Sequence, residues 1–428
     1  MIDLCGNGRQ IEDLPDAVPQ NDRTVLRDLA RQLAAIAEEP GHKETAELWR
    51  RLNDLDMQRP MIFIDEIPWQ EFASEPEMAL QCADETCRRI EGALRRTLYQ
   101  WRHFPGDMVI DKAIGAPYVW DDSGYGIRWG ECAVESGADR GARLYTASIN
   151  TLDDVQKIQD PVIEADWDAT EKLFDRLTAL FADIVPVEPH GLEHEWFSPW
   201  DRLVTNYGIT KLYTDMFDNP ELVKAAVGRF VEASHRRLDQ LEAEGLLSAV
   251  DRNRRIGSNG MGHTSELPKS GADPLHCRTV DQWGTATGQI FSEVSPAMHE
   301  EFCLQFERPY MERFGLSSYG CCEPLHNKVD MLRSVTNLRM ISMSPFVDVA
   351  KGAEAVGTDY VYCYKPNPSY LAGERWNEDV VRQDLEDVIA KTRGCHLSLI
   401  LKDIHTVRNE PRRLAEWNRV AREIVLDY

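Results

Sequence analysis

The sequence predicts an α/β protein built as one (β/α)8 (TIM) barrel with an N-terminal helical extension. From residue 60 onward, short apolar runs alternate with longer amphipathic stretches, the pattern of parallel βαβ units. No low-complexity segment, internal repeat or long flexible linker divides the 428 residues, and barrels with insertions reach this length as single units. We therefore expect residues 1–56 to form the extension and residues 57–428 to form the barrel.

The extension is expected to be helical. Asp22 precedes a run with Leu26, Leu29 and Leu33 at helical spacing, and a second helix is expected from Lys43 to Leu55. These residues carry no catalytic pattern, so we expect them to pack outside the barrel.

The barrel strands are expected at short apolar runs. Nine runs compete for eight places, and Gln289–Val294 can instead belong to the connection before the next helix. The candidate strands are Met61–Asp65, Met108–Ile114, Ile184–Val187, Arg255–Gly257, Gln289–Val294, Leu316–Tyr319, Leu338–Met343, Tyr360–Tyr364 and Leu397–Leu401. Amphipathic helices are expected at Asp168–Phe181, Pro220–Glu244, Pro296–Phe314 and Glu378–Lys391.

Composition restricts the class of protein. The formal net charge of −24, from 48 basic and 72 acidic residues, disfavours nucleic acid as a partner because phosphate binding needs a basic surface. No apolar stretch approaches the ~18 residues that span a bilayer, and the N-terminus lacks a secretory pattern. The ten cysteines show no disulfide-framework spacing. We expect a cytoplasmic protein with reduced thiols and no membrane partner.

The most informative segment is Tyr319–His326, because it follows a predicted strand and active sites of barrels lie at strand ends. Cys321, Cys322, Glu323 and His326 offer thiolate, carboxylate and imidazole groups, all of which zinc accepts. Successive residues of an extended segment point in opposite directions, so one thiol at most is expected to face the barrel mouth. Cys322 and Glu323 are the candidates. The alternative is a buried cysteine packed against a helix, with His326 in a loop.

The last predicted strand ends in Lys402, Asp403 and His405. Lysine and aspartate are rarely buried without partners, so these residues either pair with each other at the surface or act on a ligand. Asp65 and Glu66 follow the first strand; either is a candidate general acid or base, or an ordinary helix N-cap.

Indoles and one further lysine are candidates for substrate binding. Trp69, Trp200 and Trp283 could wall an apolar pocket, or could serve only to pack an insertion. Lys365, in a loop stiffened by two prolines, could neutralise an anionic ligand or lie in solvent. The glycine-rich residues 257–262 lack the spacing of a phosphate-binding loop.

The C-terminal half resembles the uroporphyrinogen decarboxylase superfamily. This superfamily also contains the methyltransferases that transfer methyl groups to corrinoid (cobalamin) proteins. Four segments carry the likeness. Tyr319–Glu323 stands in place of the family's HxCGN strand end, and Tyr364–Pro368 is similar to its QGNxDP loop. Ile290–Pro296, with Glu301-Phe302 and Pro309-Tyr310, resembles its SP…EF…PY helix, and Leu399–Val407 resembles its closing strand.

The resemblance implies a methyltransferase. In the zinc-dependent branch, the His and Cys of HxCGN and a Cys of the closing strand hold the metal. On this chain these positions fall at Gly320, Cys322 and His405. Gly320 has no ligand side chain, so Glu323 or Cys363 would have to replace the histidine.

The implied reaction moves a methyl group from a small O-, N- or S-methylated substrate to a corrinoid carried by a separate protein, with zinc as a Lewis acid on the leaving atom. Acid catalysis and substrate binding are divided among the strand-end residues. The catalytic candidates are Glu323, Asp403, Asp65 and Glu66, and the substrate-binding candidates are Trp69, Trp200, Trp283, Lys365, Lys402 and His326.

Two other functions stay open. A metal-independent decarboxylase or lyase of the same superfamily would use Lys365 and Lys402 to bind a carboxylate, and a non-catalytic barrel would bind a small molecule. Porphyrinogen decarboxylation itself is disfavoured, because Ile64–Trp69 offers acids and no arginine. The assembly state also stays open, a homodimer included.

Overall fold

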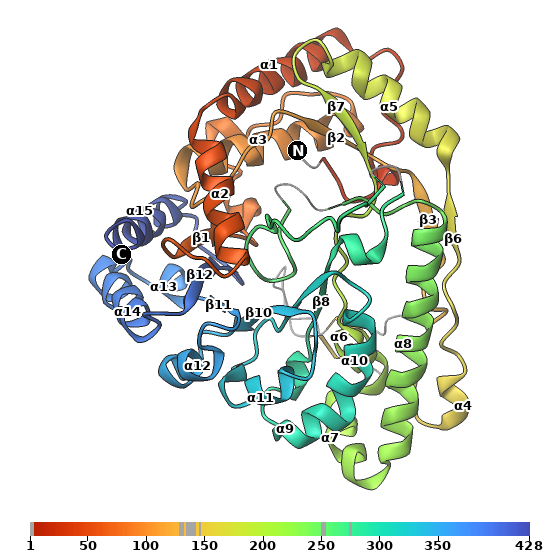
Figure 1. Cartoon of the computed structure of the whole chain (residues 1–428). Helices are drawn as coiled ribbons and strands as arrows, with labels where there is room; N and C mark the ends of the chain where they lie inside the picture. The colour runs from red at the N-terminus through yellow and green to blue at the C-terminus, as the bar shows by residue number, and fades with distance from the viewer. Residues whose placement is uncertain (1–3, 128–131, 134–142, 145–146, 250–253, 274–275) are drawn as a thin grey trace.

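The computed structural model describes residues 4–127, 132–133, 143–144, 147–249, 254–273 and 276–428. Its centre is a six-stranded parallel sheet in the order β1-β12-β11-β10-β9-β8 (Figure 1). The first and last strands of this sheet in the sequence are therefore neighbours. The strands are β1 Met61–Ile64, β8 Trp283–Ala286, β9 Leu316–Tyr319, β10 Leu338–Met343, β11 Val361–Tyr364 and β12 His396–Leu401.

Smaller sheets complete the β structure. A second parallel pair joins β2 (Ile114–Pro117) to β7 (Val187–His190). Antiparallel pairs join β3 (Trp120–Asp122) to β6 (Ile163–Ala165) and β4 (Cys132–Ala133) to β5 (Arg143–Leu144). In the described part of the chain no ladder links the β2–β7 pair to the central sheet. The parallel α/β class is confirmed, whereas ring closure is not shown.

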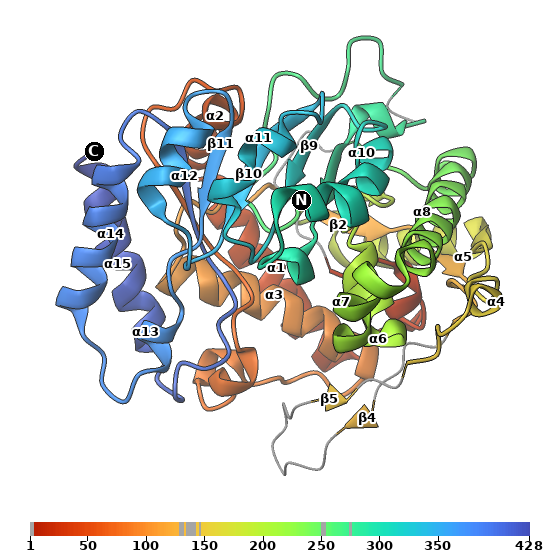
Figure 2. The same ribbon diagram turned by 90° about the horizontal axis from the view of Figure 1, so that it is seen from below.

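Helices cover the outer face of the central sheet. α14 and α15 pack side by side, and α12 lies next to α14 (Figure 2). Among the described residues no helix is both long and apolar enough to cross a membrane. The helices of this half are α9 Pro296–His299, α10 Gln305–Met311, α11 Val329–Leu332, α12 Val349–Val356, α13 Ser369–Ala372, α14 Glu378–Lys391 and α15 Arg412–Leu426.

The N-terminal helices share a hydrophobic cluster with later ones. Leu26 and Leu29 of α1 pack in one cluster with Leu94 of α3 and Leu177 of α5. Residues 1–56 thus take part in a core that includes residues of the expected barrel. The helices of this half are α1 Gln20–Ala37, α2 Gly41–Asn53, α3 Glu85–His103, α4 Leu152–Val155, α5 Trp167–Phe181, α6 Pro199–Tyr207, α7 Ile209–Asp218 and α8 Pro220–Ala243.

Five of the nine candidate strands are confirmed: β1 and β9 to β12, within a residue at each end. Each is short and has nearly all of its residues buried, as expected of a parallel sheet. Two others are displaced toward the C-terminus. The candidate Met108–Ile114 reaches β2 only at its last residue, because Ala113 forms a turn onto Asp111. Likewise Val185 hydrogen-bonds back to Phe181 and continues the end of α5, so β7 begins at Val187.

Of the remaining two candidates, Arg255–Gly257 is wrong, and Gln289–Val294 belongs to the connection before the next helix, which was the alternative for it. Gln289–Phe291 forms a 3-10 turn, and the strand of this region is β8, Trp283–Ala286, which the sequence prediction missed. Arg255 makes only an isolated antiparallel bridge to Met261. The segment 254–262 is therefore a hairpin and contributes no strand to the central sheet.

This hairpin enters the middle of the molecule (Figure 1). A Cβ on Gly260 would lie 2.3 Å from the Trp49 ring of α2. On the other side, Trp283 Nε1 donates to the carbonyl of Gly262 at 2.9 Å. The hairpin thus packs between α2 and β8, and its tip reaches the carboxyl ends of the strands.

Candidate functional site

The buried side chain of Lys402 lies among polar groups from the ends of three strands and from the hairpin tip. Lys402 Nζ, at the end of β12, lies 2.9 Å from Ser258 Oγ and 3.2 Å from Cys321 Sγ. It also pairs with Glu66 Oε1 at 3.0 Å, while its side chain is only 4% exposed. We call this the Lys402 cluster, which consists of Lys402, Ser258, Cys321, Cys322, Glu66 and Asp403.

Both thiols face the cluster. Cys321 Sγ lies 3.4 Å from Cys322 Sγ and accepts from Ser258 Oγ at 2.9 Å. Cys322 Sγ in turn donates to Asp403 Oδ2 at 3.2 Å. The expectation that one thiol at most would face this edge is wrong, because β9 ends at Tyr319 and the chain bends at Cys321 and Cys322. An extended segment would have separated the sulfur atoms.

The two thiols and the lysine differ in protonation. The hydrogen bond with Cys322, followed by the charges of Lys365 and Lys402, lowers the pKa of Cys321 to about 7 despite burial. The same contact, together with burial, raises the pKa of Cys322. Burial lowers the pKa of Lys402, but the negative groups around it raise that pKa by more. At neutral pH the cluster therefore holds an ammonium, a thiol, and a Cys321 group close to its titration point.

The predicted carboxylates also lie at this edge. Glu66 and Asp403 have φ angles of 52° and 56°, a left-handed conformation that costs free energy for residues other than glycine. The main-chain N–H of Asp403 donates to Glu66 Oε2 at 3.2 Å, so the two strained positions support each other. Asp65 forms an ion pair with Arg255 of the hairpin.

Glu323 has a different environment from the one expected. It is fully buried, and its Oε1 accepts from Thr287 Oγ1 at 2.7 Å and from the N–H of Gly288 at 3.0 Å. Its Oε2 accepts from the N–H of Cys321 at 2.6 Å. These three donors occupy the carboxylate, which fixes the turn after β9 instead of facing the Lys402 cluster as an acid or a ligand.

Gly320 has a steric reason to be glycine. Its φ is +95°, and an added Cβ would lie 2.6 Å from Leu325 Cδ1 and 2.8 Å from the carbonyl oxygen of Ser342. A histidine therefore does not fit at the position where the resemblance places a metal ligand.

The described residues do not fit the implied zinc site. Within the ranges that the structure covers, no three His, Cys, Asp or Glu side chains are grouped so that they could hold a metal ion. His405 is exposed, and Cys363 is buried in a hydrophobic cluster with Phe63 and Ile400. Between the thiol of Cys321 and the carboxylates lies an ammonium group, that of Lys402.

The predicted tryptophans belong to the core. Trp200 and Trp283 are fully buried, and the indole N–H of Trp200 donates to the carbonyl of Phe302 at 2.9 Å. Trp69 is half-buried and packs against Phe72 and Tyr99, with ring centroids 5.3 and 6.3 Å away. His326 is also half-buried, on the turn that follows Glu323.

A cavity of about 460 Å³ is lined in part by residues of the segment 192–198, one of which contacts the hairpin. His194, one of its lining residues, accepts from the N–H of Gly257 at 2.8 Å, next to Ser258 of the Lys402 cluster. Aromatic side chains do line a space here, but they are not the three that were predicted. The aromatic and charged residues of its wall include Tyr125, Trp196, Phe197, Phe230, Glu195 and Arg237.

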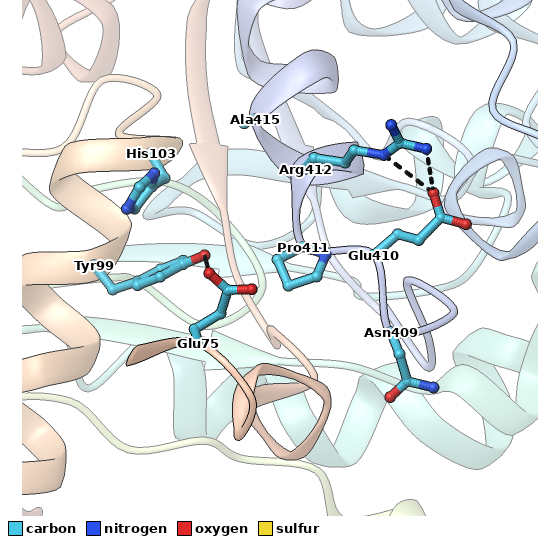
Figure 3. Close-up of a pocket in the computed structure, with 8 residues that line it drawn as sticks. All are labelled: Glu75, Tyr99, His103, Asn409, Glu410, Pro411, Arg412 and Ala415. Carbon is cyan, nitrogen blue, oxygen red and sulfur yellow. Dashed lines mark hydrogen bonds and ion pairs between the residues drawn. The ribbon is translucent and has the colours of Figure 1, made fainter. Parts of the chain in front are cut away.

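A second cavity, of about 490 Å³, lies between α3 and the start of α15 (Figure 3). Tyr99 donates to Glu75 on one side at 3.2 Å, and Arg412 pairs with Glu410 on the other at 2.8 Å. No residue of the Lys402 cluster lines this cavity, so it is separate from the candidate site.

A buried polar network lies on the other side of the turn after β9. Tyr319 OH lies 2.6 Å from His299 Nε2 and donates to Glu307 Oε2 at 2.9 Å. Burial raises the pKa of Glu307 to about 8 and lowers that of His299 to about 3. A Cβ on Gly288 would lie 3.0 Å from His299 Nε2, so the network supports the loop that holds Glu323.

No protein-family model matches the chain, and no curated protein matches it. A methyltransferase from Methanosarcina mazei is among the solved structures that the chain resembles, with 13% sequence identity and a TM-score of 0.34. The likeness covers 65% of this chain and 67% of that one.

Proposed function

We propose that the protein is a methyltransferase that moves a methyl group from a small O-, N- or S-methylated substrate to a corrinoid on a partner protein. The observation that carries the proposal is the buried Lys402 ammonium, which contacts a thiol, a hydroxyl and a carboxylate at the strand ends. The motif resemblance of residues 290–407 supports the reaction class. We propose that the scaffold of this protein is a (β/α)8 barrel in which the 254–262 hairpin lies between β7 and β8.

The leaving atom of the substrate needs stabilisation. When a methyl group departs from oxygen or sulfur, negative charge develops on that atom, and a fixed cation in a water-poor site stabilises such charge. Lys402 meets this need because it stays protonated although its side chain is 96% buried. In this proposal the lysine performs the electrostatic role that the resemblance assigns to zinc, and no step uses zinc.

The neighbouring groups hold the cation and supply a proton. Glu66 and Asp403 fix Lys402 at 3.0 and 3.8 Å. Cys322, whose pKa is raised, keeps its proton at neutral pH and is half-buried at the edge of the cluster. In the proposed reaction Cys322 or Lys402 protonates the departing atom, and the corrinoid supplies the nucleophile that accepts the methyl group.

The test is methyl transfer to free reduced cobalamin from a panel of O-, N- and S-methylated donors. The absorbance change of the cobalamin measures the transfer. Lys402→Met should lower turnover by about a hundredfold or more, as expected when a charge-stabilising group is removed. Lys402→Arg should restore part of it, and Lys351→Met, at an exposed lysine of α12, should change nothing. Failure of every donor would overturn the reaction class.

Metal content tests the role of Lys402 separately. The proposal expects activity that survives dialysis against a chelator. A purified protein with about one equivalent of zinc, lost together with activity in Cys322→Ser, would restore the zinc mechanism and overturn this one.

A decarboxylase or lyase is the second candidate. It is favoured by Lys365, which is 1% exposed at the end of β11 and has the hydroxyl of Ser342 as its hydrogen-bond partner. A buried ammonium of this kind suits a carboxylate substrate. Release of carbon dioxide from a carboxylate without any methyl acceptor would establish this function in place of methyl transfer.

A further inference from the structure

The two buried lysines at the strand ends differ in their counter-charges. Lys402 has Glu66 at 3.0 Å and Asp403 at 3.8 Å, so its charge is balanced within the protein. For Lys365 the described residues supply a hydroxyl, that of Ser342, and no carboxylate ion pair. Both Lys365 and Ser342 are at least 99% buried. Of the two lysines, Lys365 is therefore the one with charge available for a ligand.

A buried ammonium without an anion is costly, because burial removes its hydration. One source of negative charge that interacts with Lys365 is Cys321, whose pKa is lowered in part by Lys365. That sulfur already accepts from Ser258 at 2.9 Å and from Lys402 at 3.2 Å. The thiolate is therefore shared, and an anion from outside the chain would complete the surroundings of Lys365.

Asn259 gives a second, independent sign of a missing ligand. Its side chain is fully buried, and neither Oδ1 nor Nδ2 has a hydrogen-bond partner among the residues that the structure describes. Asn259 stands between Ser258, which contacts Lys402, and Gly260, which lies against Trp49. Asn259 thus directly follows a residue of the Lys402 cluster, and its buried amide has one donor group and one acceptor that no described residue uses.

We propose that the substrate is a small carboxylate, with its carboxylate group bound by Lys365 and a polar group of the same molecule hydrogen-bonded by Asn259. That the carboxylate is the methyl donor rests on the proposed function, whereas its binding does not. Lys402 then remains free to act on the reacting atom, so the two lysines have separate tasks.

Binding of matched probes tests the proposal. Each pair shares its methyl group and differs in the carboxylate: para-methoxybenzoate against para-methoxybenzamide, and N,N,N-trimethylglycine against choline. We expect at least one carboxylate to bind more tightly than its partner without a carboxylate by about tenfold or more, as for a charge-assisted hydrogen bond. Equal binding within both pairs, or no binding by either carboxylate at millimolar concentration, would overturn the proposal.

Variants assign the preference to residues. Lys365→Met should abolish the preference for carboxylates, Lys365→Arg should retain part of it, and Lys351→Met at the exposed control site should retain all of it. Asn259→Leu should weaken carboxylate binding and raise the unfolding temperature of the free protein, because it removes an unsatisfied buried amide. If carboxylate binding is unchanged in both Lys365→Met and Asn259→Leu, the proposal is overturned. Asn259 would then hold only a buried water.

The design separates this inference from the proposed function. If carboxylates bind in a Lys365-dependent way but no methyl group reaches cobalamin, the binding site stands and methyl transfer falls. If neutral donors are demethylated as fast as carboxylates and Lys365→Met has no effect, methyl transfer stands and the carboxylate site falls.

Discussion

Glu307→Gln provides a quantitative test of the buried network beneath the site. The Glu307 carboxyl is fully buried with a pKa of about 8, against 4.5 for an exposed glutamate. Between these two values the unfolded chain releases a proton that the folded protein retains. Stability is therefore lost as the pH rises through this window, by up to about 1.4 kcal/mol per pH unit. Between pH 5 and pH 7 the loss amounts to about 2.5 kcal/mol.

The variant should remove this loss. Glutamine keeps the shape of the side chain and can still accept from Tyr319, but it does not titrate. We expect the free energy of unfolding of Glu307→Gln, relative to the parent, to rise by about 2 kcal/mol between pH 5 and pH 7. Urea titrations at several pH values measure this difference. The lowered pKa of His299 has the opposite effect, because it makes the protein less stable as the pH falls. His299 is present in both proteins, so its contribution cancels in the difference between their free energies of unfolding.

The control is Glu354→Gln, at an exposed glutamate of α12, which should give a curve parallel to that of the parent. If Glu307→Gln also stays parallel to the parent from pH 5 to pH 8, Glu307 is ionised in the folded protein and the reasoning about its burial is refuted.

Three further predictions concern the site and its surroundings. Lys402→Met should raise the pH midpoint of Cys321 alkylation above about 7, because a neighbouring positive charge is lost. Alkylation by iodoacetamide at several pH values, measured by peptide mass spectrometry, gives this midpoint, and an unchanged midpoint contradicts the prediction. Gly320→Ala should lower the free energy of unfolding by about 2 kcal/mol or more in urea titrations, because of its φ and its close contacts. Trp200→Phe should cost about 1–3 kcal/mol of stability through the lost bond to Phe302 and leave substrate affinity unchanged; a change in affinity would return Trp200 to the binding site.

The central sheet was largely predictable because its strands are buried on both faces. Met61–Ile64 and Val361–Tyr364 read as short apolar runs, and Leu316–Tyr319 and Leu338–Met343 begin and end with apolar or aromatic residues. β8 was missed because Trp283, Gly284 and Thr285 form no such run. Thr285 hydrogen-bonds to Ser318 of β9 at 2.9 Å, so a polar pair occupies a buried position that local sequence does not reveal.

The position of the site was predictable, but the orientation of its side chains was not. Lys402, Cys322 and the acids after β1 meet at the carboxyl ends of strands, as the barrel rule implies. Glu323 faces the other way because of the turn at Gly320, and the roles of Ser258 and Asn259 depend on a hairpin that packs far from its neighbours in sequence. The glycines of segment 257–262 were the sequence signal for that hairpin, because they allow its close contact with Trp49.

The pairing of β1 with β12 has a consequence for how the chain is made. Met61 pairs with Ser398 and Ile64 with Leu401, and within the described residues β1 forms a ladder with no other strand, so β1 gains its ladder only after β12 has been synthesised. Until then β1 is an apolar strand with an open edge, which favours aggregation and slow folding. We expect chains released before β12 to depend on chaperones and to be degraded, whatever the stability of the finished protein.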